Sequence, residues 1–304
     1  MPAPSIHTYA PRDYLRQFAA GAAAVPQLLT AAAEQFFIVP VERLYPLFTQ
    51  ALPPTRATAH TCLLLTSGTA TMHIGPERCT IGPGELLLVR AGQVYAFEPG
   101  DQNTGLLCHF HDDLLIGPAG RADALAAFSL LHFWGGPVVR LDAGTAGFVE
   151  NLLRRLLVEY EAHALEHPRL VRAYLLALLE ELHQAAVTDL PVAQDTAGTL
   201  ANRFKQLVAT SLSSLHLVSD YAERLHVTPN YLTKAVRTAT GKPPARWIEE
   251  SIVLEAKVLL GHSTWPISDI AQRVGLSDPS YFSRLFKKHA GLSPLAYRKK
   301  VEKS

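Results

Sequence analysis

The last third of the chain carries one sequence pattern twice, and this repeat limits the folds that the chain can adopt. The first copy starts at Ser219 and reads SDYAERLHVTPNYLTKAVRTATGKPPARW. The second copy starts at Ser268 and reads SDIAQRVGLSDPSYFSRLFKKHAGLSPLAYR. The copies are 49 residues apart up to Ser277 and 50 residues apart after it, which a single inserted residue explains. Because a solenoid needs three or more repeats, two copies predict a pair of similar compact units.

Each copy has the pattern of a helix, a tight turn and a second helix. Thr228 and Asp278 are residue types favoured at helix N-caps, and each precedes a proline, which is favoured at the first helical position. Gly241 and Gly291 stand where a glycine commonly ends a helix. Steps of three and four residues then place one set of positions on a single helical face, toward a core. These positions are Leu232, Ala235, Val236 and Ala239 in the first copy, and Phe282, Leu285, Phe286 and His289 in the second.

The opposite face of each second helix is polar and basic. Amide, hydroxyl and cationic side chains on an exposed helix can bond to base edges and phosphates in the major groove of DNA. One such helix alone is usually only a solvated helix, whereas two matched copies favour DNA binding. The residues are Asn230, Thr233, Lys234 and Arg237 in the first copy, and Ser280, Ser283, Arg284 and Lys287 in the second.

The charge of the chain is divided between its two parts. Residues 199–304 contain 16 lysines and arginines against 8 acidic residues, a net charge of +8. Residues 1–198 contain 12 against 19, a net charge of −7, so the total of +1 hides the division. Every lysine of the chain lies at or after Lys205. This asymmetry indicates a polyanion-binding module attached to a different kind of domain.

The repeat region resembles the AraC/XylS-type transcription regulators over about residues 200–300. The resemblance is specific because it rests on many positions in a fixed order. They are Ala256, Lys257, Leu259, Leu260, Ile267, Asp269, Ile270, Ala271, Gly275, the run YFSRLFKK from Tyr281 to Lys288, Gly291, Pro294, Tyr297 and Arg298.

This resemblance implies two helix-turn-helix units joined by a long helix over residues 245–260, with two recognition helices in successive major grooves of DNA. Two positions depart from the family pattern. Leu276 replaces the usual phenylalanine, which is a tolerable change in a core, and Ser251 replaces an arginine of the linking helix, which removes a phosphate or packing contact. The resemblance assigns base contacts to Asn230, Thr233, Lys234, Ser280, Ser283 and Arg284, and backbone contacts to Arg237, Lys287 and Lys288.

The first half of the chain has a different pattern. Between about residues 55 and 115, short apolar runs alternate with glycine and proline, which is typical of a small antiparallel barrel or sandwich. The predicted strands cover 62–66, 69–74, 85–89, 94–97 and 106–110.

Two helices are predicted after the strands, over residues 145–163 and 168–186. The second is apolar around its whole circumference, so we expect both its sides to be buried, one against the barrel and one in a homodimer interface. Residues 187–198 lack periodicity and are expected to form a linker.

The strands and the two helices resemble, more loosely, the cupin-like sensor half of the same regulators. The expected fold is therefore α+β with two domains. Residues 1–186 form a cupin-like β-barrel with two following dimerisation helices, and residues 199–304 form an all-α double helix-turn-helix domain. Cupin enzymes hold a metal with a His-x-His pair and a later histidine, and the matching positions here are His60, Cys62 and Tyr95. These replacements argue against a catalytic metal, and we expect no cofactor.

A pocket for a small-molecule effector is favoured over a metal site in the barrel. His109 and His111 share a strand face and form a competing pair of metal ligands, but such a pair more often ends an exposed strand. The polar candidates for effector binding are Arg56, His60, Arg90, Tyr95 and His109, with an arginine first if the effector is an anion.

Composition excludes several classes of protein. The three cysteines are not spaced as pairs, which argues against disulfides and thiolate zinc sites and favours a reducing compartment. No run of about 18 apolar residues is free of charge and proline, so we expect no membrane span. Gly21 and Pro26 interrupt the alanine-rich stretch over 18–33, so a signal peptide is not expected. Nucleophile-elbow, phosphate-loop and dinucleotide motifs are absent from the sequence.

Together these features predict a cytoplasmic transcription regulator that is not an enzyme. Its expected partners are double-stranded DNA, a second copy of the chain and a small-molecule effector, with RNA polymerase as a further candidate. Two alternatives stay open. One is a cupin metalloenzyme, a dioxygenase or isomerase, with an appended DNA-binding tail. The other is a constitutive DNA-binding protein whose barrel serves only for dimerisation.

Overall fold

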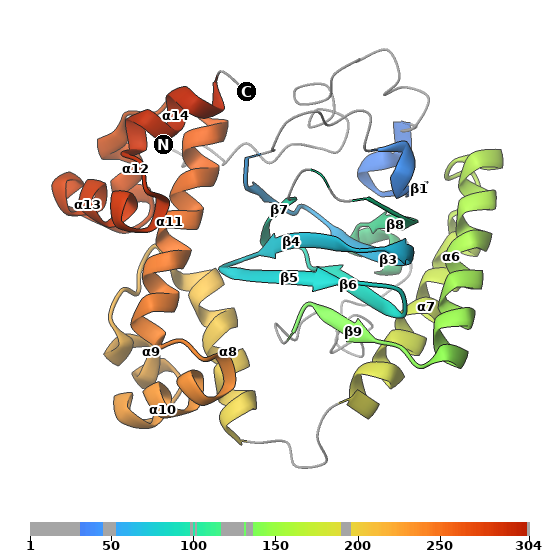
Figure 1. Ribbon diagram of the computed structural model, residues 1–304, viewed down its shortest axis with the longest axis horizontal. Coiled ribbons are helices and arrows are strands. Elements are labelled where there is room, and N and C mark those ends of the chain that lie inside the picture. The colour runs from blue at the N-terminus through green and yellow to red at the C-terminus, as the bar shows by residue number, and fades with distance from the viewer. Residues whose placement is uncertain are drawn as a thin grey trace.

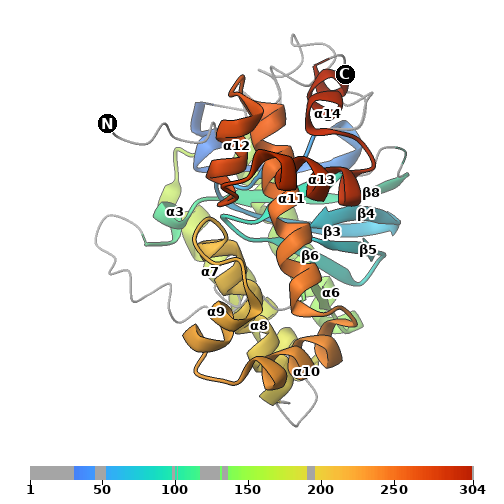
Figure 2. The same cartoon turned by 90° about the vertical axis from the view of Figure 1, so that its left-hand side faces the viewer.

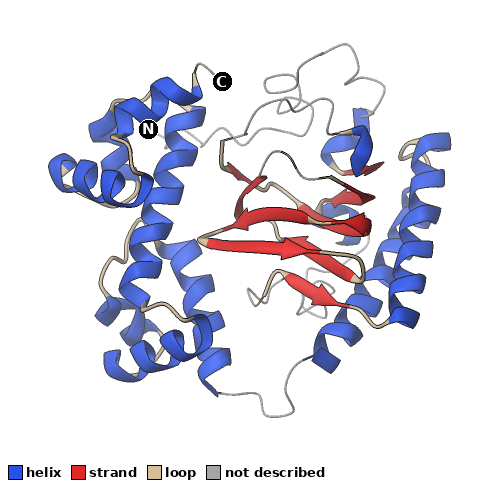
Figure 3. Ribbon diagram, viewed as in Figure 1, coloured by secondary structure: helices blue, strands red, loops and turns tan. Residues whose placement is uncertain are grey.

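The computed structural model describes residues 31–44, 53–97, 100, 102–116, 131, 136–189 and 196–302. A sheet-rich domain has two long helices against one side, and the helices of the carboxy-terminal part lie on its other side (Figure 1, Figure 3). Most of the alanine-rich stretch over 18–33 and the middle of the expected linker, residues 190–195, lie outside the described residues.

The strands form two antiparallel sheets rather than one closed barrel. The five-stranded sheet has the order β1-β8-β3-β6-β9, and the four-stranded sheet has the order β2-β7-β4-β5. The strands are β1 (Phe36–Pro40), β2 (Thr55–Arg56), β3 (His60–Gly68), β4 (Ala70–Ile74), β5 (Glu77–Ile81), β6 (Glu85–Val89), β7 (Val94–Phe97), β8 (Asn103–Phe110) and β9 (Val138–Arg140).

The five predicted strands correspond to β3, β4, β6, β7 and β8, and the structure adds four strands to them. Of these, β2 and β9 have only two and three residues, too few for a periodic signal. β5 was missed because it is half polar: its sequence ERCTI is buried only at Ile81. β1 has the apolar sequence FFIVP but lies ahead of the segment with regular turn signals.

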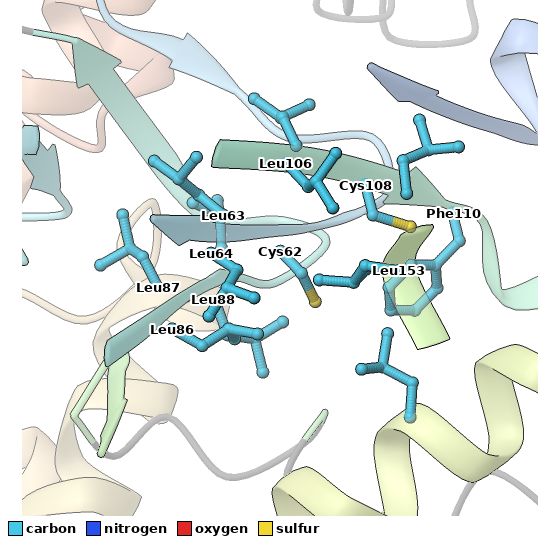
Figure 4. Packing of buried hydrophobic residues seen from close by; sticks show 14 of the residues in the cluster. Cys62, Leu63, Leu64, Leu86, Leu87, Leu88, Leu106, Cys108, Phe110 and Leu153 are labelled. Atoms are coloured by element: carbon cyan, nitrogen blue, oxygen red, sulfur yellow. The ribbon is translucent and has the colours of Figure 1, made fainter. Parts of the chain in front are cut away.

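Part of the core of the sheet-rich domain lies between the five-stranded sheet and the helix pair that covers it. Cys62 of β3 is the register partner of Cys108 of β8, and both are fully buried beside Phe110 and Leu153 (Figure 4). Burial raises the pKa of the Cys62 thiol to about 12, and it raises the pKa of Cys108 well above its ordinary value. Both cysteines therefore act as small apolar core residues.

Two long helices follow the sheets. They are α6 (Ala143–His163) and α7 (Pro168–Asp189), and shorter elements are η1 (Ala31–Glu34), η2 (Val41–Arg43) and α3 (Asp112–Ile116). Asp142 caps α6, because its side chain accepts hydrogen bonds from the backbone N–H groups of Gly144 and Thr145.

The expectation that one side of α7 packs on the sheet-rich domain and the other in a homodimer interface stays a prediction for the second side, which a single chain does not test. The buried face of α7 is formed by Val171, Leu175, Leu178 and Leu182, which have no exposed surface. The opposite face carries exposed alanine and glutamate side chains, so α7 is an amphipathic helix of ordinary type.

The carboxy-terminal part is all helical and has a separate hydrophobic core. Its central element is a long helix that runs between two smaller groups of helices (Figure 2). The elements are α8 (Thr196–Ser211), α9 (Val218–Arg224), α10 (Pro229–Thr240), α11 (Pro244–His262), α12 (Ile267–Arg273), α13 (Pro279–Ala290) and α14 (Pro294–Val301). None of the helices in the described ranges combines the length and apolarity that a bilayer span requires.

Candidate nucleic-acid interface

The two copies of the sequence repeat fold into two helix-turn-helix units, α9 with α10 and α12 with α13. In the first unit, Thr228 Oγ1 accepts a hydrogen bond of 3.2 Å from the backbone N–H of Tyr231. Pro229 then occupies the first turn of α10, and Gly241 ends the helix in the left-handed conformation, with φ of 71°. The caps fix both ends of α10 as the sequence predicts.

The second unit has the same construction. Asp278 Oδ1 accepts a hydrogen bond of 2.8 Å from the backbone N–H of Ser280, and Pro279 follows the cap. Gly291 ends α13 with φ of 74°. Both helices contain 12 residues, so the repeat in sequence is a repeat in backbone geometry.

The two helices also have the same burial pattern, position by position, from Pro229 to Thr238 and from Pro279 to Lys288. Leu232, Ala235 and Val236 are buried in α10, and Phe282, Leu285 and Phe286 occupy the matching positions in α13. The fourth core position behaves differently in each copy. Ala239 is exposed, so its assignment to the core is wrong, and His289 bonds to Glu249 instead of entering the apolar cluster.

The predicted base-contacting residues lie on the outer faces of α10 and α13. Thr233 and Ser283 are half-buried at equivalent positions, and Thr233 Oγ1 donates a hydrogen bond of 2.8 Å to the carbonyl of Pro229. The Thr233 hydroxyl can therefore act toward DNA mainly as an acceptor. The exposed members of the set are Asn230, Lys234, Ser280 and Arg284.

The predicted phosphate-contacting residues differ in how freely their charges can reach DNA. Arg237 and Lys287 are exposed at equivalent positions of the two helices. Lys288 donates a hydrogen bond of 2.7 Å to Glu249 Oε2 on α11, and His289 Nε2 lies 2.7 Å from the same oxygen. Burial alone would raise the pKa of Glu249, but Lys288 and His289 lower it overall, so this carboxylate stays ionised beside Lys288.

The tight turns of the two units contain a pair of equivalent residues with left-handed backbone, which the sequence analysis did not identify. His226 has φ of 57°, and Gly275, its partner in the repeat, has φ of 85°. A β-carbon on Gly275 would lie 2.0 Å from His216 Nε2 and 2.6 Å from the carbonyl of Ser213. The alignment of the two copies could have identified His226 as a residue with left-handed backbone, because its partner in the second copy is a glycine.

The two departures from the family pattern have different surroundings. Leu276 is buried in the helical core, as a replacement for a larger apolar residue should be. Ser251, in contrast, lies on α11 where it lines a cavity between the helical part and the sheet-rich domain. An arginine at this position would add a fifth charged side chain to the lining of this cavity, which already contains Arg56, Glu77, Lys205 and Glu255.

Polar contacts connect the sheet-rich domain to the helices that support the two units. Arg56 of β2 forms an ion pair with Glu255 of α11 and also donates to the carbonyl of Gly92. Lys205 of α8 donates a hydrogen bond of 2.7 Å to Glu77 of β5. These contacts join Arg56, one of the predicted effector-binding residues, to the helix that links both units.

The other predicted effector-binding residues do not converge with Arg56 on one pocket. Neighbouring residues of β3, His60 and Thr61, point to opposite faces of the sheet, and His109 bonds through Nδ1 to the Thr61 hydroxyl at 3.0 Å. His60 and His109 therefore lie on opposite faces. His60 Nδ1 accepts from the N–H of Ala91 at 3.3 Å, so its Nε2 carries the proton and donates to Asp112 at 2.8 Å.

Burial dominates the electrostatics of the remaining candidates. It lowers the pKa of Arg90 to about 10 and raises the pKa of Tyr95 to about 12. Burial, together with the positive charges that His60 and His111 would carry, lowers the pKa of His109 to about 3. His109 stacks on Phe37 with ring centroids 4.8 Å apart, and its Nε2 is buried without a hydrogen-bond partner among the described residues.

Two family models match the chain in sequence order. One, described as the AraC-like ligand binding domain, matches residues 48–179. The other, described as a helix-turn-helix domain, matches residues 221–300. The first match covers β2 to β9, α6 and the first part of α7, and the second covers both helix-turn-helix units except the first residues of α9.

Curated relatives are named as regulators of the same type. The uncharacterized HTH-type transcriptional regulator YisR of Bacillus subtilis is 31% identical over 151 residues, which are 48% of this chain and 50% of that protein. The HTH-type transcriptional activator RhaR of an Enterobacter species is 27% identical over 173 residues, 56% of this chain and 60% of that protein. The chain thus spans about half the length of these relatives.

Among solved structures, the carboxy-terminal domain of AraT from Geobacillus stearothermophilus is 31% identical, with a TM-score of 0.33, and covers 35% of this chain and 88% of its own. ToxT from Vibrio cholerae is 13% identical, with a TM-score of 0.43, and covers 87% of this chain and 97% of its own. The family assignment follows from the two matched domains and the named relatives: the chain belongs to the AraC family of transcription regulators.

Proposed function

We propose that the chain binds DNA in a sequence-specific manner and regulates transcription in response to a small-molecule effector. The observation that carries this proposal is the equivalence of α10 and α13, which share caps, core positions and an exposed polar face. A helix with a purely structural role needs only its apolar face, which packs against the core. Two equivalent outer faces with amides, hydroxyls and cations supply what reading two stretches of base edges requires.

The placement of α10 and α13 supports simultaneous contact with one DNA duplex. The two units lie toward opposite ends of α11 (Figure 2). With 19 residues and a rise of about 1.5 Å per residue, α11 is about 28 Å long. This length is comparable with the helical repeat of B-DNA, about 34 Å, so the two recognition helices suit successive major grooves on one face of the duplex.

Each predicted contact has a distinct role in this proposal. Arg284 can donate two hydrogen bonds to guanine, one to O6 and one to N7. Lys234 occupies the equivalent position in the first unit. Asn230, Thr233, Ser280 and Ser283 supply the shorter polar contacts. Arg237, Lys287 and Lys288 bind phosphates, with Lys288 held back by Glu249 in the absence of DNA.

The contacts between the sheet-rich domain and the helices give the effector a route to the DNA-binding surface. Arg56 with Glu255, and Lys205 with Glu77, join elements on the two sides. An effector that binds more tightly to one arrangement of these contacts shifts the population toward that arrangement. We assign effector binding to the sheet-rich domain, with Arg56, His60, Arg90, Tyr95 and His109 as the residues to test.

The proposal includes a homodimer formed through the outer helices. Phe148 and Val158 of α6 have exposed fractions of 62% and 60%, and Leu170 at the start of α7 has 37%. Burial of apolar side chains of this size by a second copy would stabilise a dimer. Sedimentation at micromolar concentration tests this part, and a monomer would contradict it.

We place the protein in the cytoplasm, with RNA polymerase as a further partner, and we assign it no catalytic activity. The test of the central proposal is selection of bound fragments from the source genome by the full-length protein, with and without candidate metabolites. An enriched operator supports DNA-binding regulation. A protein that binds every fragment equally at moderate ionic strength would contradict it.

The selection has a matched pair of variants. Arg284→Ala removes a predicted base contact, whereas Arg169→Ala removes an exposed cation on α7, away from both units. We expect the first variant to change the enriched sequences and the second to leave them unchanged.

A further inference from the structure

We propose that Glu159, His163 and His167 form a zinc-binding site at the turn that joins α6 to α7. The three residues follow one another at intervals of four, Glu-x3-His-x3-His, in the segment EYEAHALEH. One ligand atom from each residue lies within 4.8 Å of the others, and no further group of three metal-ligating side chains occurs among the described residues. The cluster lies outside both helix-turn-helix units and contains none of the predicted effector-binding residues.

The backbone of the turn brings the third residue back to the first two. Glu159 and His163 share one face of α6 because they are four residues apart. The helix then ends at Ala164, whose φ of 53° reverses the chain. The carbonyl of His167 accepts the N–H groups of Leu170 and Val171 in the first turn of α7, which fixes His167 at the start of that helix.

The distances within the cluster suit a small metal ion. His167 Nδ1 lies 2.7 Å from Glu159 Oε1, and His163 Nδ1 lies 3.3 Å from the same oxygen. Two ligands at tetrahedral angles, each about 2.0–2.1 Å from zinc, are about 3.3 Å apart. His163 therefore already has the required separation, and His167 needs to move by about half an ångström. Both imidazoles are about half exposed, so their side chains have room to adjust.

The carboxylate is held so that one oxygen stays available to the histidines. Glu159 is buried, with a side-chain exposure of only 4%, and its Oε2 accepts a hydrogen bond of 2.9 Å from Arg155. The Arg155 guanidinium lies 5.4 Å from the ring centroid of Tyr174 on α7, which fixes its position. Metal ligands commonly have such outer partners, which orient them toward the ion.

The donor set fits zinc. Two imidazole nitrogens and one carboxylate oxygen match the three-ligand sites that zinc occupies with a water molecule in the fourth position. Calcium and magnesium prefer oxygen ligands throughout, so they fit poorly here. The exposed histidines leave the fourth position open to solvent. Bound zinc would then cross-link the end of α6 to the start of α7, next to Tyr160, whose ring packs against Phe36 of β1.

The experiment uses full-length protein with any polyhistidine tag removed, because a tag binds the same ions. Zinc binding is measured by calorimetry, and Co²⁺ serves as a spectroscopic probe because a tetrahedral site gives intense visible absorption. We expect one zinc ion per chain, a tetrahedral Co²⁺ spectrum and a rise in Tm when zinc is added. Loss of ligands in the double variant His163→Ala/His167→Ala should weaken zinc binding by at least about 10-fold.

Two further variants separate a metal site from a hydrogen-bonded turn. Glu159→Gln keeps the size of the side chain but removes the anionic ligand, so it should weaken zinc binding although the turn can still fold. His183→Ala removes another histidine from α7 and should leave zinc binding unchanged. The proposal is overturned if the native chain binds zinc no better than the double variant, or if His183→Ala loses as much affinity. It is also overturned if Co²⁺ binds without a tetrahedral spectrum.

Discussion

His226 and Gly275 occupy the same place in the two halves of the repeat, and both have a left-handed backbone although only one of them is glycine. Each residue directly follows the C-cap of the short first helix of its unit, where the chain turns toward the recognition helix. The left-handed conformation costs a residue with a β-carbon about 1–2 kcal/mol. The two units therefore have the same turn but not the same strain in it.

Gly275→Ala should destabilise the helical part strongly. The new β-carbon would meet His216 and the Ser213 carbonyl at distances that require the chain to move. Together with the backbone strain, we expect a loss of about 2–4 kcal/mol in the free energy of unfolding. Urea denaturation measures it, and a loss below 1 kcal/mol would show that the segment around His216 yields easily.

His226→Gly should stabilise the helical part, which is the opposite effect to that of Gly275→Ala. Removing the β-carbon relieves the strain at a φ of 57°, while the added flexibility of the unfolded chain offsets part of the gain. We expect a net stabilisation of about 0.5–1 kcal/mol. The same denaturation experiment checks it, and a destabilised variant would mean that the His226 side chain makes a contact that outweighs the strain.

Arg284→Ala and Lys287→Ala should separate sequence recognition from general affinity. Loss of Arg284 should relax the preference at one base pair, worth about 1–3 kcal/mol, with little change elsewhere. Loss of Lys287 should weaken all sequences alike and lower the salt slope of binding by about one unit. Titration of operator and mutated operators at several salt concentrations measures both, and an unchanged preference in Arg284→Ala would show that α13 is oriented differently.

Glu249→Gln should increase DNA affinity without changing sequence preference. The substitution removes the carboxylate that holds Lys288 and His289 at 2.7 Å, so Lys288 becomes free to bind a phosphate. One additional phosphate contact steepens the salt dependence by about 0.9 in slope. The double variant Glu249→Gln/Lys288→Ala should lose this gain, and equal slopes in the native chain and Glu249→Gln would contradict the role given to Lys288.

Acid should destabilise the sheet-rich domain through His109. Its pKa of about 3 in the folded chain lies below the ordinary 6.5, because burial and the nearby His60 and His111 oppose the charged form. The unfolded chain binds the proton more readily, so stability is full above about pH 6.5 and falls between pH 6.5 and 3. At pH 5 the loss is about 2 kcal/mol. His109→Asn should flatten this part of the pH profile, and an unchanged slope would assign the effect to another group.

The two helix-turn-helix units and the helix between them could be predicted from the sequence, whereas α8 and α14 were not predicted. The signals of the two units are local: Thr228 with Pro229, Asp278 with Pro279, and the two ending glycines lie within single helices, and the caps form as expected. Because the same signals occur in both copies of the repeat, the helix boundaries predicted in one copy supported those predicted in the other. The error at Ala239 arose because helical periodicity places a residue on a face but does not say how far along the helix the core extends.

The sheet-rich domain was harder to predict because its contacts are distant in sequence. The rhythm of turns indicated strands, but β5 escaped detection and the pairing of β1 with β8 joins segments about 70 residues apart. The association of Arg56 with Glu255 could not be predicted from either segment alone. The cluster of Glu159, His163 and His167 was visible as a spacing of four, but only the reversal at Ala164 brings His167 to the other two.

Because α11 is one continuous helix, its length fixes the distance between the two recognition helices. Five base pairs inserted between the two recognised stretches would rotate one of them by about half a turn, to the far side of the duplex. Ten inserted base pairs would restore the helical phase but exceed what a rigid helix can span. Binding by one chain should thus tolerate neither insertion, unlike binding by two subunits joined through a flexible connection, which can regain contact after a full turn.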